Sequence, residues 1–91
     1  MLIYLSTSFY IETAKEAVEQ FQVDDMENCY LCPVLVFSGL KNLSEKEKMP
    51  LRLDLLSVCD EIIFLGDLND EMKQELEFAR LVNMEVSFIE E

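Results

Sequence analysis

The stretch Ile62-Ile-Phe-Leu-Gly-Asp67 decides the fold class of this chain of 91 residues. Four consecutive apolar residues that end at a glycine are typical of a strand covered on both faces, as strands are in a parallel sheet. Leu2-Ile-Tyr-Leu-Ser6 has the same character near the start of the sequence and ends in small polar residues. Both stretches therefore predict strands at the centre of a parallel sheet.

Helical and extended patterns alternate along the rest of the chain. Apolar residues recur at three- and four-residue spacing after each of the two central strands, and Pro50 is well placed in the first turn of a further helix. The helices are expected over 11–21, 50–60 and 71–82. Further extended segments are expected over 30–37, with an interruption at Pro33, and over 86–89. The polar residues 41–48 are expected to form a loop or one turn of helix.

Strands that alternate with helices imply right-handed crossovers between parallel strands. The expected fold is a single α/β domain over residues 1–91, a doubly wound four-stranded parallel sheet with strand order 2-1-3-4 and helices on both faces. In such a sheet ligands bind at the carboxyl ends of the first and third strands, where the winding reverses. The loops 6–10 and 66–70 are therefore expected to border the functional site.

The charge balance narrows the range of partners. Nineteen Asp and Glu residues against seven Lys and Arg give a formal net charge of −12, which repels the phosphates of nucleic acids and of anionic lipids. No apolar run approaches the roughly 20 residues that span a bilayer, and the first residues lack the pattern of a signal peptide. We therefore expect a cytoplasmic protein that binds neither nucleic acids nor membranes.

Three cysteines, Cys29, Cys32 and Cys59, raise the question of redox or metal chemistry. Cys29 and Cys32 have the spacing of a redox pair, but such a pair stands at the start of a helix, whereas Pro33-Val-Leu-Val-Phe37 is expected to be extended. A zinc site would need a fourth ligand, and the chain has no histidine. The three thiols are expected to be reduced, and buried or half-buried in the core.

The side chains expected near the strand ends leave carboxylate chemistry as the main possibility. The absence of histidine excludes catalysis by Ser-His-Asp or Cys-His groups, and the sequence contains no glycine-rich phosphate loop. A carboxylate can attack an anomeric carbon, because the transition state carries positive charge there. Glu75, early in the last helix, suits this role if a hydroxyl such as that of Tyr4 orients it. The candidate catalytic residues are Glu75, Tyr4 and Asp54, and the candidate substrate-binding residues are Ser6, Ser8, Asp67 and Asp70.

Each main candidate also has a purely structural interpretation. Glu75 is one of several glutamates in its helix and could be an ordinary surface residue. Tyr4 could be a packed aromatic side chain, and Asp54 could pair with Arg52 or Lys48 on a solvated face. On composition alone, these structural interpretations are favoured.

Four pieces of the sequence resemble the nucleoside 2-deoxyribosyltransferase-like superfamily, especially its small members, over nearly the whole chain. The pieces are Ile3-Tyr-Leu-Ser6, Cys32-Pro-Val-Leu-Val-Phe37, Leu55-Leu-Ser-Val-Cys-Asp-Glu-Ile-Ile-Phe-Leu-Gly-Asp67 and Met72-Lys-Gln-Glu-Leu-Glu-Phe-Ala79. The last two pieces, followed by Asn83-Met-Glu-Val86, are the most specific part of the resemblance.

The resemblance implies a role for each candidate. In enzymes of this superfamily a helix glutamate attacks the anomeric carbon of the sugar and displaces the base, and Glu75 matches that nucleophile. Tyr4 matches a strand tyrosine that hydrogen-bonds the nucleophile, and Asp54 matches an acidic residue that helps to handle the nucleobase. Asp67 and Asp70 lie where the family binds sugar hydroxyls. The resemblance further implies a homodimer or larger assembly, and no cofactor or metal is expected.

Three departures from the family pattern keep a second function open. Glu71 stands where the family usually has glycine or another small residue, and its carboxylate would repel a phosphate. The loop before Met72 is about one residue short, and Val34 replaces a histidine that related small proteins often carry. The first function is an N-glycoside hydrolase or glycosyltransferase acting on a nucleoside or nucleotide. The second is a non-catalytic module that binds a nucleotide-like ligand or a protein.

Overall fold

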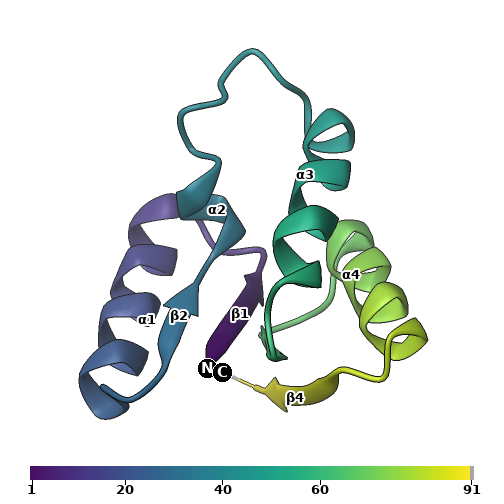
Figure 1. Cartoon of the computed structure of the whole chain (residues 1–91). Coiled ribbons are helices and arrows are strands. Elements are labelled where there is room, and N and C mark those ends of the chain that lie inside the picture. Colours follow the sequence, from purple (N-terminus) through teal and green to yellow (C-terminus); the bar gives the residue numbers. More distant parts are fainter. Residues whose placement is uncertain (91) are drawn as a thin grey trace.

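The computed structural model describes residues 1–90, and in this range four parallel strands form one sheet with the order β2-β1-β3-β4 (Figure 1). The elements are β1 (Leu2–Thr7), α1 (Ile11–Asp24), β2 (Cys29–Leu31), α2 (Pro33–Val36), α3 (Glu45–Ser57), β3 (Glu61–Leu65), α4 (Asp70–Leu81) and β4 (Glu85–Ile89). The doubly wound parallel sheet predicted from the sequence, with its strand order, is confirmed.

β1 and β3 are the central strands, as their continuous apolar runs predict. Side chains alternate between the two faces of a strand, so Ile3 and Leu5 of β1 lie in one core and Tyr4 lies in the other. Ser6 shares the face of Tyr4 and pairs in register with Phe64 of β3. This alternation directs one tyrosine and one serine hydroxyl towards the same side of the sheet.

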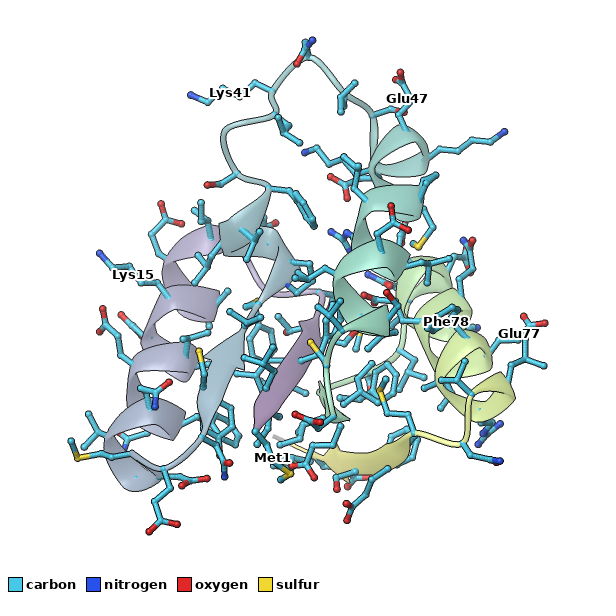
Figure 2. The ribbon with its side chains drawn as sticks, in the orientation of Figure 1. Met1, Lys15, Lys41, Glu47, Glu77 and Phe78 are labelled. Carbon is cyan, nitrogen blue, oxygen red and sulfur yellow. The ribbon has the colours of Figure 1, made fainter. Side chains whose placement is uncertain are left out.

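Helices cover the two faces of the sheet in pairs. In Figure 1, α1 and α2 lie on one side of β1, and α3 and α4 lie on the other. The core under α1 and α2 is made by Ile3, Leu5, Ala14, Tyr30, Cys32, Ile63 and Leu65. The core under α3 and α4 is made by Tyr4, Leu56, Cys59, Ile62, Phe64, Met72 and Ala79. Charged side chains such as Lys15 of α1 and Glu77 of α4 point outward on opposite sides of the molecule (Figure 2).

The segment expected to be extended over 30–37 is shorter and then helical. β2 ends at Leu31, and Pro33 begins the helix α2. Proline cannot donate to a sheet ladder, and its fixed φ suits the first position of a helix. Cys32 therefore does precede a helix, contrary to the expectation. Its side chain is buried, however, and burial raises the pKa of the thiol, which disfavours a reactive thiolate.

Cys29 differs from the other two cysteines. Cys32 and Cys59 are buried, as expected, but Cys29 at the start of β2 is exposed, so the expectation was wrong for this residue. β2 is an edge strand of only three residues, and the first of them has little to cover it. All three thiols are free in the structure.

The helix α3 begins five residues earlier than Pro50 predicts. Ser44 accepts a hydrogen bond from the backbone N–H of Glu47, and the Glu47 side chain accepts one from the backbone N–H of Ser44. This capping box starts the helix, so residues 41–44 are a turn and loop, and 45–48 form the first turn of α3. Pro50 lies inside the helix, and because it has no N–H it leaves the carbonyl of Lys46 without its helical donor.

The edge strand β4 is the least covered part of the sheet. Phe88 is 54% exposed and stacks on Phe64 of β3, and Ile89 is 43% exposed.

Among the described residues, no helix has the length and apolar character needed to cross a membrane. Self-association stays a prediction.

Candidate functional site

The carboxylate of Glu75 lies inside the protein rather than on its surface. Met72, Glu75 and Ala79 are the buried residues of α4, and their spacing of three and four places them on one stripe of the helix. That stripe faces the sheet, so Glu75 occupies a position that an apolar residue would normally fill. Its side chain is fully buried, and the interpretation of Glu75 as an ordinary surface residue is wrong.

Two hydroxyl groups from β1 hold this carboxylate. The Tyr4 hydroxyl donates to Glu75 Oε2, and the Ser6 hydroxyl donates to Oε1 at 2.7 Å. Tyr4 and Ser6 are two residues apart on the strand, so they share a face, and both are fully buried. Each carboxylate oxygen therefore has its own donor, and the orientation of the group is fixed. This arrangement brings together three residues that the sequence singled out.

Burial dominates the ionisation of this group. Removal from water raises the pKa of Glu75 above its ordinary value of 4.5, while hydrogen bonds from Tyr4 and Ser6 and the positive charge of Arg52 act in the opposite direction. Burial and the neighbouring carboxylate raise the pKa of Tyr4, which keeps the phenol protonated as a donor. A carboxylate whose charged form is disfavoured by burial but supported by specific donors is typical of a functional site.

A cavity of about 330 Å³ opens beside this group at the carboxyl end of β1. Its volume is near the lower end of the roughly 300–1,000 Å³ found for small-molecule sites. The cavity is lined by Thr7, Ser8, Phe9, Tyr10, Ile11, Val34, Glu45, Arg52, Asn69 and Glu71. Asn69 caps α4 by accepting from the backbone N–H of Met72 at 2.9 Å, so the start of this helix borders the cavity. This location agrees with the loops 6–10 and 66–70 that the topology predicts.

Arg52 and Glu71 connect the cavity to the buried carboxylate. Both line the cavity, and the charges of both act on Glu75: Arg52 lowers its pKa and Glu71 raises it. Glu75 itself does not line the cavity. Glu75 lies one helical turn after the cavity-lining Glu71 on α4, and charged side chains that line the cavity influence its ionisation.

Gly66 shapes the end of β3 at this edge of the sheet. Its φ of +78° lies in the left-handed region, which favours glycine over other residues. A Cβ at this position would meet the ring of Phe9 at 3.4 Å. Glycine thus lets the chain turn after β3 while Phe9, a cavity-lining residue, packs against it.

The other candidates from the sequence are placed differently. Ser8 lines the cavity and is exposed. Asp67 and Asp70 are exposed and do not line it, while Asn69 between them does. Asp54 is exposed on α3 and also lies outside the lining. Asp54 pairs with neither Arg52 nor Lys48, because both cations pair with Glu45.

Arg52 is the functional candidate that the sequence analysis missed. It is two residues from Asp54, which is roughly 200° around a helix, so when one of them faces the sheet the other faces solvent. Only 7% of Arg52 is exposed. A single arginine in a run of leucines was the available signal. For Asn69, the signal was a helix-capping residue type directly before an acidic first turn.

A second cavity is lined by residues of α3 and α4. Its volume is about 410 Å³, and Glu45 and Glu71 line both cavities. Met49 and Leu53 of α3 give it an apolar wall, and Gln74 of α4 gives it an amide. Glu45 and Glu71 therefore stand at the boundary that the two cavities share.

No group of three or more Cys, Asp or Glu side chains among residues 1–90 is arranged to hold a metal ion. Comparisons of the chain with protein-family models, curated proteins and solved structures found no match. The case for a function therefore rests on the geometry of the site and on the resemblance seen in the sequence.

Proposed function

We propose that this protein hydrolyses or transfers the N-glycosidic bond of a nucleoside or nucleotide, with Glu75 as the nucleophile. The observation that carries the proposal is a buried carboxylate with one hydroxyl donor on each oxygen, next to a cavity of ligand size. The resemblance of the sequence to nucleoside 2-deoxyribosyltransferase-like proteins supports it, because Tyr4 and Glu75 are the matching residues.

The chemistry would proceed in two steps. A Glu75 oxygen forms a bond to the anomeric carbon while the bond from that carbon to the base nitrogen breaks, and the electron pair of that bond goes to the base. Water or a second base then attacks the same carbon and releases Glu75. Tyr4 and Ser6 hold the carboxylate in place throughout, and its negative charge stabilises the positive charge that develops on the sugar.

The burial of Glu75 sets a condition on this mechanism. Reacting atoms must come within about 3–3.5 Å of each other, and Glu75 is fully buried in the ligand-free structure. Ligand binding must therefore open a path from the cavity to the carboxylate. The same observation favours the second candidate function, a non-catalytic binding module in which Glu75 takes no part in any reaction.

The decisive experiment measures release of free base from a panel of nucleosides and nucleoside monophosphates. Wild-type protein should release base, and Glu75→Gln should reduce the rate by about 1,000-fold or more, because the amide keeps the shape of the side chain but is not a nucleophile. Glu77→Gln is the matched control, since Glu77 is an exposed glutamate on the same helix. Its rate should equal that of wild type.

The outcomes separate the two functions. Release by wild type and not by Glu75→Gln supports the enzyme. If no base is released but a nucleoside raises the melting temperature, the binding module is correct and catalysis is excluded. Equal release by wild type and Glu75→Gln contradicts the role of Glu75.

A further inference from the structure

Arg52 carries hydrogen-bonding capacity that the protein does not use. Only 9% of the side chain is exposed. Its Nη2 donates to Glu45 Oε2 at 3.1 Å, but its buried Nε has no hydrogen-bond partner within residues 1–90. A buried donor without a partner is destabilising and calls for an explanation. The Nε atom has almost no accessible surface, but the Arg52 side chain lines the cavity, so a ligand there would meet a guanidinium that is not fully paired.

The charges around Arg52 indicate what kind of ligand it can hold. Glu45 and Glu71 line the same cavity, so two carboxylates accompany one guanidinium, and the chain as a whole has a net charge of −12. A phosphate dianion would be repelled by both carboxylates. A neutral planar group that offers acceptors to Arg52 and donors to a carboxylate fits this cavity better.

We propose that Arg52 selects the base of the ligand and that a guanine-type base is preferred. This inference rests on the proposed function. Guanine presents O6 and N7 as adjacent acceptors, which the planar fork of an arginine binds together. Its neighbouring edge presents N–H donors, which Glu71 can accept. Adenine presents an amino group in place of O6, so the guanidinium would face a donor.

The same contact assists the reaction. When the bond between the anomeric carbon and N9 breaks, its electron pair enters the purine ring, and the new bond forms to a Glu75 oxygen. Arg52 stabilises the negative charge of the departing purine at O6 and N7. The purine then takes a proton from water. Arg52 is therefore a specificity-determining residue that also stabilises the leaving group.

The test measures binding of guanosine, adenosine and guanosine monophosphate to the full chain by calorimetry. Guanosine should bind about 10- to 100-fold more tightly than adenosine, the range of a good two-point arginine contact. Guanosine monophosphate should bind more weakly than guanosine because of the two carboxylates. Arg52→Lys keeps the charge but loses the fork, so it should remove the preference for guanosine. Arg80→Lys, an exposed arginine of α4, should keep it.

A second variant guards against loss of folding in Arg52→Lys. Glu71 is at the partly exposed start of α4, and Glu71→Gln should weaken guanosine and strengthen guanosine monophosphate without unfolding the protein. Equal binding of guanosine and adenosine, or tighter binding of the monophosphate, would overturn the inference and leave the proposed function intact. Failure of every nucleoside and nucleotide in the panel to bind would overturn the proposed function itself.

Discussion

Each face of the sheet carries a hydrogen bond from a tyrosine hydroxyl to a carboxylate, but one of these pairs is buried and the other is partly exposed to water. On the face under α3 and α4, the Tyr4 hydroxyl donates to Glu75, and both are fully buried. On the face under α1, the Tyr30 hydroxyl donates to Asp25 at 2.7 Å, and Asn28 donates to the same oxygen at 2.7 Å. Asp25 follows the end of α1 and is partly exposed to water.

The two carboxylates respond in opposite directions. Hydrogen bonds, first that from Asn28, lower the pKa of Asp25 below its ordinary value, whereas burial raises the pKa of Glu75 despite its two donors. Burial and the bond to Asp25 raise the pKa of Tyr30 to about 12. Donors alone therefore do not set the ionisation of a carboxylate. At Glu75, the loss of water raises the pKa more than the two donors lower it, and this makes Glu75 a candidate for chemistry. Asp25 only links the end of α1 to Asn28 and Tyr30 through hydrogen bonds.

The largest difference in stability between the two pairs is expected when each tyrosine hydroxyl is removed in turn. Tyr4→Phe leaves a buried oxygen of Glu75 without its donor and should lower the free energy of unfolding by about 1–3 kcal/mol. Tyr30→Phe should cost less, because water can replace the lost donor at Asp25. Urea denaturation of both variants at neutral pH measures the difference. Equal losses would show that burial does not distinguish the two pairs.

The pH dependence of stability should sharpen the comparison, because the two shifts have opposite signs. The folded-state pKa of Glu75 is raised, so stability is lost as pH rises from about 4.5 through that pKa. The folded-state pKa of Asp25 is lowered, so its contribution is present above 3.8 and is lost as pH falls. Glu75 changes the free energy of unfolding by at most about 1.4 kcal/mol per pH unit.

Two variants separate these contributions from the repulsion of the whole charged surface. Glu75→Gln and wild type should be similarly stable near pH 4, and the variant should gain on wild type as pH rises to 7. Asp25→Asn should be less stable than wild type at pH 7, and the gap should close as pH falls below 3.8. Urea denaturation across this range checks both trends. Parallel curves for the two variants would contradict the assigned shifts.

The smallest effect is expected from the second donor on the buried side. Ser6→Ala removes the hydrogen bond to Glu75 Oε1 and should lower the free energy of unfolding by about 0.5–1.5 kcal/mol. Ser6→Ala and Tyr4→Phe each remove a single hydroxyl oxygen, so the comparison reports on the two hydrogen bonds, of which the bond from Tyr4 acts more strongly on Glu75. Thermal denaturation compares the two. A larger loss in Ser6→Ala than in Tyr4→Phe would mean that Ser6 is the main support of the carboxylate.

The sequence predicted most of the fold because its signals were local. Short apolar runs predicted the strands β1 and β3, and the spacing of apolar residues predicted the helices α1 and α4. The errors fell at the two prolines. Pro33 was interpreted as an interruption of an extended segment, but it begins the helix α2. Pro50 was interpreted as the first turn of a helix, but the capping box at Ser44 starts α3 earlier. A capping box is readable in a sequence, so the true start of α3 was within reach.

The site was harder to predict than the fold. Alternation along β1 places Tyr4 and Ser6 on one face, and this was readable. The burial of Glu75 was not, because a glutamate in an acidic helix normally faces water. For a related reason, Asp54 and not Arg52 was selected as the candidate on α3. The two residues are about 200° apart around the helix, and only the docking of α3 on the sheet decides which of them faces inward.

By itself, the sequence determined the order of strands and helices and the winding of the sheet, and with them the edge of the sheet beside which the cavity lies, because periodicity and chain connectivity fix these. The packing of α3 and α4 against β1 decided the rest. It brought Glu75 under two hydroxyls of a strand 69 and 71 residues away and withdrew its carboxylate from water. Desolvation depends on every neighbour in space at once, so no local pattern of residues can specify it.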